Sequence, residues 1–353
     1  MSLSAVWSQD SLAHDPKGEV WIGVHIEGDE IPERGTEMKR AVDDVGLDVI
    51  EPEEHDDAAI TAVHDPGMSD YLRNAHHEWV EAGYPDDPGQ DRVVAYAFRH
   101  PGAFGYLPDR LPLSRSAMAG VYCMDTCTVL GPNSYKGIRY AVDASLTAAD
   151  VVIGTGSHAY AAVRPPGHHA GTDYFGGSCY LNNAAIAANH MTATTGSRVG
   201  IVDIDAHHGN GTQQIFYERS DVVYTSVHVD PGEGWFPHWC GFADERGAGI
   251  GAGSNLNFPL RPGSGDDVFV DAVTAAADLV IEKGCELLVV SLGVDSGTTD
   301  PNSPLLVSTA GFGRVGSLLA GMGLPTVLVH EGGYSLPDLA VDTSAVLTPF
   351  SAT

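Results

Sequence analysis

The stretch DIDAHHGNG, residues 203–211, places two carboxylates and two imidazoles within six residues, directly after an apolar run. That run, residues 198–202, is typical of a buried strand, and the Gly-Asn-Gly at its far end favours a turn into a helix. Open α/β sheets bind their ligands beyond the carboxyl ends of their strands. Carboxylates and imidazoles together suit a divalent metal ion. The stretch therefore predicts an α/β fold with a metal site at one edge of its sheet.

Helix-like and strand-like segments alternate from about residue 137 onward. Strands alternating with helices imply parallel βαβ units. The runs at 287–292 and 326–330 are apolar on both faces, as expected of strands buried under helices. The pattern predicts helices at 137–149, 181–193, 213–218, 266–283 and 309–322, and strands at 158–163, 198–203, 222–228, 286–292 and 325–330.

Three further strand ends carry reactive side chains. They are the segments RPPGHH at 164–169, GVD at 293–295 and HEGGY at 330–334. If the sheet is parallel, all of these ends open on the same edge as residues 203–211. Each motif alone is weak, and their convergence is the physical argument for a site.

Asp205 and His207 alternate with apolar residues, so both side chains are expected to point to one side. Asp295 completes an Asp-His-Asp set, and three protein ligands leave a coordination position for water and substrate. One Zn²⁺ per chain is the first candidate, and Fe²⁺ or Co²⁺ also suit these ligands. The alternative, that Asp205 and His207 only cap or hydrogen-bond in the core, is disfavoured by so dense a motif.

His168 and His169 follow a Pro-Pro-Gly turn and are interpreted as general acid and base beside the metal. A catalytic histidine needs an acceptor on its far nitrogen, and Asp203 and Asn210 remain available for that role. A pair of purely structural histidines is the alternative. Tyr334 follows Gly-Gly, and its phenol could donate to a developing oxyanion, although such a tyrosine alone is more often a packed ring.

The composition excludes several classes of protein. With 353 residues and 43% apolar residues the chain can bury a sizeable core. The net charge of −29 repels nucleic acid, and it serves either to steer a cationic substrate or only to keep the protein soluble. Five cysteines do not make a disulfide framework, and Cys123 and Cys127 are expected to be ordinary buried residues. No membrane span or secretory signal is expected, so the cytoplasm is the default location.

Two segments lack regular periodicity. Residues 80–120 are rich in Gly, Pro and Asp, and so long a loop is usually functional or an assembly element. Residues 229–255 are Gly-rich and contain an aromatic group at 235–239. This second loop is either a packed Ω-type loop or, as we favour, a wall of the pocket.

Together these motifs resemble the histone deacetylase superfamily, which has the arginase/deacetylase fold. The strings GGSCYLNN at 176–183 and GFADE at 241–245 add to the match, which runs from about residue 30 onward. The resemblance implies a three-layer α/β/α fold with a central, mostly parallel, eight-stranded sheet. It also implies one catalytic domain over residues 1–353, with an insert-like loop at about 80–120.

The resemblance implies a role for each matching residue. Asp205, His207 and Asp295 would bind zinc, His169 would be the general base and acid with His168 assisting, and Tyr334 would polarise the scissile carbonyl. Arg34, in Ile31-Pro-Glu-Arg34, matches an arginine near the family's internal acetate channel. A structural K⁺ or Na⁺ would be held at positions matching Asp203, Asp205, His207, Ser226 and Val227, and a second monovalent ion at Phe216 and Val222.

The sequence is most similar to the bacterial acetylpolyamine amidohydrolases. Asn210 stands where class I deacetylases have Asp, and the segment 84–120 matches an insert that narrows the active-site mouth and builds a dimer. A homodimer or higher homo-oligomer is therefore expected. Gly177, Ser178, Phe236 and Gly332 are expected to contact substrate. The family usually has an aromatic residue at the position of Ser178, opposite Phe236, so the tunnel should be wider and wetter.

The predicted function is zinc-dependent hydrolysis of a linear amide in an acetylated polyamine or a similar small cationic amine. Two alternatives concern the substrate: an acetyl-lysine side chain of a protein, or a bulkier amide that exploits Ser178. A two-manganese ureohydrolase would need a second carboxylate two residues after Asp295, and position 297 is glycine. A binding protein without activity is disfavoured because every reactive position is intact.

Overall fold

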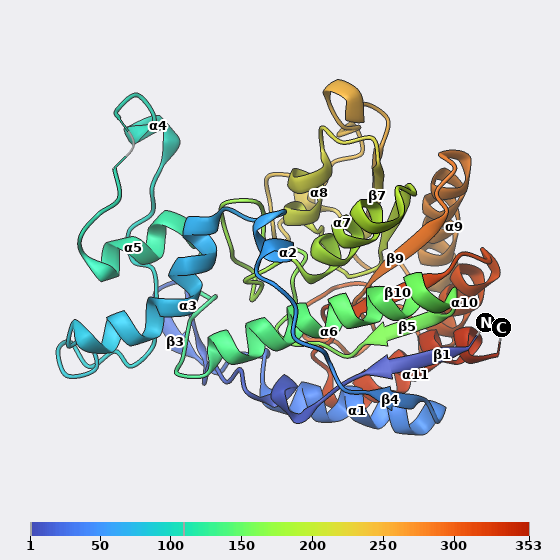
Figure 1. The fold of residues 1–353 in the computed structure, drawn as a ribbon, viewed down its shortest axis with the longest axis horizontal. Coiled ribbons are helices and arrows are strands. Elements are labelled where there is room, and N and C mark those ends of the chain that lie inside the picture. Colours follow the sequence, from blue (N-terminus) through green and yellow to red (C-terminus); the bar gives the residue numbers. More distant parts are fainter. Residues whose placement is uncertain (1, 109, 353) are drawn as a thin grey trace.

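An eight-stranded sheet forms the centre of the computed structural model, which describes residues 2–108 and 110–352 (Figure 1). Every recorded pairing between its strands is parallel. The predicted three-layer fold is confirmed, and the sheet is entirely rather than mostly parallel. In spatial order the strands are β4 (Asp48–Ile50), β1 (Leu3–Val6), β5 (His158–Ala161), β10 (Thr326–His330), β9 (Leu287–Leu292), β6 (Val199–Asp203), β7 (Val222–Val229) and β8 (Asn255–Leu260).

Helices cover both faces of this sheet. On one face α6 (Ser134–Thr155) and α7 (Asn183–Thr195) pack against a cluster that includes Ile201 of β6. On the other face, Val202 of the same strand packs in a second cluster. Alternate strand residues thus enter different cores, which explains why the strands read as continuously apolar. The helices of the second face are α1 (Pro32–Val45), α9 (Asp266–Glu282), α10 (Thr309–Gly321) and α11 (Leu336–Ser351).

The predicted element boundaries need some corrections. Helix α6 extends from Ser134 to Thr155, and α8 (Asn210–Phe216) begins within the Gly-Asn-Gly rather than after it. Helix α7 begins at Asn183 because the side chain of Asn182 accepts the backbone N–H of Ala185 at 2.9 Å, as an N-cap does.

Strands β1, β4 and β8 were not anticipated from sequence. Strands β1 and β4 have only four and three residues, too few to show a period. Strand β8 lies at the edge of the sheet, is only partly buried and contains Pro259, which is tolerated at an edge because its missing N–H leaves no neighbour unpaired. All three are therefore identified by tertiary pairing rather than by local sequence.

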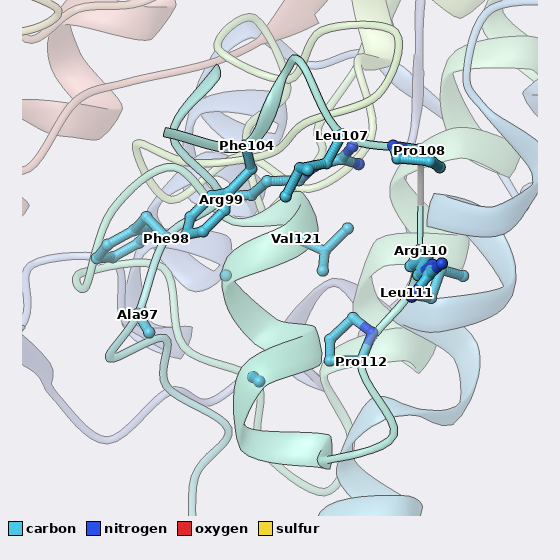
Figure 2. Close-up of a pocket in the computed structure, with 12 residues that line it drawn as sticks. Ala97, Phe98, Arg99, Phe104, Leu107, Pro108, Arg110, Leu111, Pro112 and Val121 are labelled. Carbon is cyan, nitrogen blue, oxygen red and sulfur yellow. The ribbon is translucent and has the colours of Figure 1, made fainter. Parts of the chain in front are cut away.

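The segment at 80–120 projects from the layers and is largely irregular, as predicted. It follows α3 (Pro66–Glu81) and contains α4 (Pro101–Phe104) and most of α5 (Arg115–Tyr122) (Figure 1). A cavity of about 550 Å³ lies between the 97–112 loop and α5, with Val121 pointing into it (Figure 2). Several large apolar side chains of the segment are exposed, namely Tyr96, Phe98, Phe104, Tyr106, Leu107, Leu111 and Leu113.

A small hairpin lies outside the central sheet. Strands β2 (Glu19–Trp21) and β3 (Val24–Ile26) pair antiparallel, and α2 (Ala58–Thr61) is a single turn.

All five cysteines are free, as expected; Cys123 is buried, but Cys127 is only half-buried. Within the described residues, no helix combines the length and apolarity needed to cross a membrane.

Candidate metal centre

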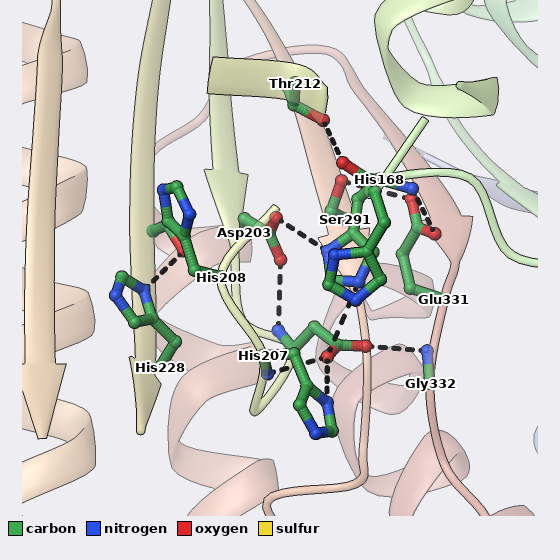
Figure 3. Close-up of polar contacts among 12 residues, drawn as sticks. His168, Asp203, His207, His208, Thr212, His228, Ser291, Glu331 and Gly332 are labelled. Atoms are coloured by element: carbon green, nitrogen blue, oxygen red, sulfur yellow. Dashed lines mark hydrogen bonds and ion pairs between the residues drawn. The ribbon is translucent and has the colours of Figure 1, made fainter. Parts of the chain in front are cut away.

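The four strand ends singled out from sequence converge in the structure. Strands β5, β10, β9 and β6 are consecutive in the sheet and parallel, so their carboxyl ends share one edge. Figure 3 shows His168, His207 and Glu331, from three of these ends, around one polar network. Parallel topology therefore assembles the site from segments far apart in the chain.

Asp205, His207 and Asp295 form a compact group in which one ligand atom from each lies within 4.8 Å of the others. His207 Nδ1 is 2.9 Å from Asp295 Oδ2 and 3.3 Å from Asp205 Oδ1. Both carboxylates are also fixed by backbone donors: Ala206 N donates to Asp295 Oδ1 and Gly332 N to Asp205 Oδ2, each at 2.7 Å. The ligand candidates are therefore pre-oriented by the strand-end loops.

The electrostatics of this group favour a bound cation. Burial and the neighbouring Asp205 carboxylate raise the pKa of Asp295 to about 7. Burial lowers the pKa of His207, but the Asp205 and Asp295 carboxylates that accept its hydrogen bonds raise it well above its usual value. Two buried carboxylates this close repel one another unless a positive charge lies between them. The donor set of two oxygens and one imidazole nitrogen fits a divalent ion.

Gly293 and Gly332 have no side chain that would collide with the carboxylates of Asp205 and Asp295. A Cβ on Gly332 would lie 2.5 Å from Asp205 Oδ2 and 2.6 Å from Asp295 Oδ2. A Cβ on Gly293 would lie 2.2 Å from Asp205 Oδ2. Real Cβ atoms do not approach oxygens so closely, so both positions need glycine for close approach. Gly332, predicted to contact substrate, thus also orients a ligand candidate through its N–H.

The two adjacent histidines pair as expected with the two acceptors left over from the metal group. His168 Nδ1 is 3.1 Å from Asp203 Oδ2, and His169 Nδ1 is 2.7 Å from Asn210 Oδ1. Because an amide oxygen can only accept, the His169 proton must lie on Nδ1, and Nε2 keeps its lone pair. This is the tautomer that a general base needs.

The two imidazoles differ in charge although their ring centres are only 4.0 Å apart. Burial opposes the charged form of His168, but the Asp205 and Asp203 carboxylates raise its pKa to about 10. Burial, and then the neighbouring His168 and His207, lower the pKa of His169 well below its usual value. The surroundings of His168 therefore favour its charged form, and those of His169 favour its neutral form. The pair has the opposed titration typical of an acid-base site.

Glu331 is a site residue to which no role was given from sequence. Its Oε2 accepts the N–H groups of Gly167 at 2.7 Å and of His168 at 3.2 Å. The carboxylate, whose pKa burial raises to about 7, thus holds the turn that carries the histidine pair. An acid directly after strand β10 was the available signal, but its partners lie on another strand end and could not be identified.

Tyr334 lies beside Arg34, which is fully buried. The Arg34 guanidinium carbon is 4.6 Å from the centre of the Tyr334 ring. Arg34 also donates to the carbonyls of Gly333 and Glu331, at 2.7 and 2.6 Å, and pairs with Glu30. Burial raises the pKa of the Tyr334 phenol well above its usual value, so the hydroxyl stays a donor.

Two of the residues predicted to contact substrate, Phe236 and Gly177, lie against His169. The Phe236 ring meets the His169 ring edge-on, with centres 4.7 Å apart. A Cβ on Gly177 would lie 2.5 Å from His169 Cδ2, so the backbone passes directly beside the imidazole. Ser178 is half-buried and has φ +61°. The Phe236 contact supports the interpretation of the 229–255 loop as a wall of the site.

The Gly177–Ser178 turn depends on Asp125, which sequence reasoning missed. Asp125 Oδ2 accepts Gly177 N at 2.5 Å, and Thr128 Oγ1 accepts Ser178 N at 2.9 Å. Asp125 lies between Cys123 and Cys127, and its partner Gly177 is far along the chain, so local spacing could not indicate the contact.

The residues predicted to hold monovalent ions fall into two places. Asp203 and Ser226 are paired across β6 and β7, beside Val227, and all three are fully buried. Phe216 ends α8, and Val222 begins β7 at the opposite end of that strand. This arrangement agrees with two separate positions, and ion binding there stays a prediction.

The comparison with protein families agrees with this geometry. The histone deacetylase domain family matches residues 29–349. The chain belongs to the histone deacetylase family. A solved structure, that of acetylpolyamine aminohydrolase from Burkholderia pseudomallei, superposes with a TM-score of 0.92 and 36% identity over 100% of this chain and 99% of that one.

Among curated members of the histone deacetylase family, the chain is similar to two acetylpolyamine amidohydrolases along nearly its whole length. One, from Mycoplana ramosa, is 34% identical over 98% of each chain, and one from Burkholderia pseudomallei is 38% identical over 97% of each. Histone deacetylase 8 of Arabidopsis thaliana is 34% identical over 62% of this chain and 61% of its own. Family membership supports a hydrolase of the deacetylase type that acts on amide bonds.

Proposed function

We propose that the protein is a zinc-dependent amidohydrolase that removes the acetyl group from an acetylated polyamine or a similar small cationic amine. The observation that carries the proposal is the group of Asp205, His207 and Asp295 beside a neutral His169 whose Nε2 is free. Similarity to acetylpolyamine amidohydrolases along the whole chain supports the substrate class.

In this proposal, the bound metal would polarise the amide carbonyl and lower the pKa of a water molecule. His169 Nε2 takes a proton from the attacking water and later returns one to the leaving amine. His168 stays positively charged and stabilises negative charge that develops nearby. The phenol of Tyr334 donates a hydrogen bond to the carbonyl oxygen as its charge grows.

The substrate assignment is tested with purified protein loaded with one equivalent of Zn²⁺, Fe²⁺ or Co²⁺. A panel of acetylated polyamines, acetyl-lysine peptides and aryl acetamides should give the highest kcat/KM for the polyamines, because a chain of net charge −29 attracts cations. A preference for acetyl-lysine peptides would support the protein deacetylase alternative. No hydrolysis of any acetyl amide would refute the proposed function.

Ser178 should set the acyl or linker preference. We expect Ser178→Tyr to raise kcat/KM for linear acetylpolyamines and to lower it for bulkier acyl amides, because an aromatic ring would face Phe236 and narrow the tunnel. The ratio of the two kcat/KM values measures the effect. Ser178→Ala is the matched control, because it removes the hydroxyl without filling space, and thermal unfolding reports any strain at φ +61°. An unchanged ratio would show that position 178 is not a tunnel wall.

A homodimer through the insert at 80–120 is part of the proposal, with residues 1–353 as one catalytic domain. Exposed apolar side chains around the cavity in Figure 2 support it, because monomers rarely expose such a patch. Light scattering should give a dimer mass for the wild type and a monomer mass for Leu111→Glu. Val268→Glu, at a half-exposed position on α9, is the matched control. A monomeric wild type would contradict the assignment.

The proposal also includes a structural K⁺ or Na⁺ at Asp203, Ser226 and Val227, and a second ion near Phe216 and Val222. The full burial of Asp203, at the end of β6, and of Ser226, which is paired with it on β7, supports the first position. If the ions bind there, exchanging K⁺ for a bulky organic cation should lower the midpoint of thermal unfolding.

A further inference from the structure

The loop that carries Tyr334 is fixed by Asp300, which is neither a ligand candidate nor a partner of the histidine pair. Asp300 is 8% exposed, and its Oδ2 accepts the backbone N–H of Tyr334 at 2.6 Å and that of Ser335 at 3.1 Å. Its other oxygen accepts Asn302 N at 3.0 Å. Hydrogen bonds to a charged acceptor are stronger than neutral ones, so Asp300 is a firm anchor for this backbone.

The same peptide group is held from its other end. The carbonyl of Gly333 and the N–H of Tyr334 belong to one planar peptide unit. Arg34 Nε donates to that carbonyl at 2.7 Å, while Asp300 accepts that N–H at 2.6 Å. A cation and an anion therefore clamp the Gly333–Tyr334 peptide at its two poles.

The clamp selects one of two peptide orientations. Gly333 has φ +131°, and a glycine lacks the Cβ that would otherwise restrict rotation of the neighbouring peptide. A flipped peptide would point its N–H at the Arg34 guanidinium and its carbonyl at the Asp300 carboxylate. Both contacts would be repulsive. The charges of Arg34 and Asp300 therefore fix the orientation of a peptide that the flexible Gly-Gly backbone would leave free to rotate.

We propose that Asp300 is a positioning residue for Tyr334. By fixing the Gly333–Tyr334 peptide against Arg34, it holds the phenol within hydrogen-bond reach of the position of the substrate carbonyl. The inference rests on the proposed function, in which Tyr334 donates to that carbonyl. Asp300 does not touch substrate in this scheme and acts only through the tyrosine. Placement matters because a donor displaced from the developing oxyanion loses most of its effect.

A double-mutant cycle separates this role from a general structural one. Asp300→Ala should lower kcat roughly 10- to 100-fold with little change in KM, bounded by the effect of Tyr334→Phe. In the Tyr334→Phe background, Asp300→Ala should have almost no further effect, because the hydroxyl it positions is already gone. Asp300→Asn, which keeps one acceptor oxygen, should recover part of the activity.

Asp338→Ala is the matched control. Asp338 also contacts this loop, since its Oδ2 accepts the Ser335 hydroxyl at 3.0 Å and also that of Thr299, but it does not bond to the clamped peptide. Its removal should leave kcat within about twofold, as for a surface change away from the site. Metal content should be unchanged in all of these variants.

Amide hydrogen exchange over residues 331–335 gives a readout independent of turnover. Asp300→Ala should speed exchange in this loop relative to the wild type, and Asp338→Ala should affect it much less. Equal losses of kcat with and without the Tyr334→Phe substitution, or an unchanged exchange rate, would overturn the inference. An inactive wild type would instead refute the proposed function, and the exchange comparison would still test the clamp. If Asp300→Ala does not fold, the cycle and the exchange measurement are carried out with Asp300→Asn.

Discussion

Replacing Asp295 by Asn should leave the protein without tightly bound divalent metal and without measurable hydrolysis of acetylated amines. Asp295 is one of three ligand candidates, and the side-chain amide carries no charge to balance the ion. Loss of a residue that merely orients a ligand already weakens metal binding by about 10- to 100-fold, so loss of a ligand should cost more. Elemental analysis after dialysis and the rate of acetate release measure the two effects.

The matched control for Asp295→Asn is Asp342→Asn. Asp342 is also a buried carboxylate with a raised pKa, but it bonds to Thr309 on α10 and is not one of the ligand candidates. Asp342→Asn should retain metal and activity. A full complement of metal in Asp295→Asn would show that other residues hold the ion.

Replacing His169 by Ala should abolish turnover while the metal stays bound. His169 is not among the ligand candidates, and its Nδ1 is committed to Asn210, so only Nε2 serves the reaction. General acid-base catalysis by one side chain contributes about 10²- to 10⁴-fold, and here one imidazole serves both proton transfers. The measurements are kcat and metal content on the same preparation.

His190→Ala controls for the removal of an imidazole as such, because His190 lies on α7 and pairs with Asp150. This variant should keep wild-type turnover. Turnover retained by His169→Ala would refute the assigned role, and loss of metal from that variant would show that His169 supports the centre instead.

The sequence predicted that the site residues converge at one sheet edge. It predicted the hydrogen bonds between them only in part. Runs such as 287–292 and 326–330 identified parallel strands, and parallel strands must bring Asp205, Asp295 and Tyr334 to one edge. Once the ligand candidates were assigned, Asp203 and Asn210 remained as possible acceptors for the histidine pair, and both contacts are present in the structure. All of these residues lie within or shortly after a strand that the sequence pattern identifies.

Residues that act across loops could not be found in this way. Glu331 holds a turn that follows β5, and Asp300 holds the loop that follows β10. Nothing in the sequence around either acid names its partner, because both pairings arise only when separate strand ends meet. The short strands β1 and β4 were missed for the same reason: their pairing is tertiary.

The close fit of Gly293 and Gly332 against the two carboxylates has a consequence for how the protein can diversify. The two carboxylates lie so close to the main chain at Gly293 and Gly332 that any side chain at either glycine would displace them. Position 178, by contrast, belongs to a turn held through its own backbone N–H, so a change of its side chain leaves that hydrogen bond in place. If position 178 lines the tunnel as proposed, a substitution there would therefore change the acyl preference without moving the ligand candidates.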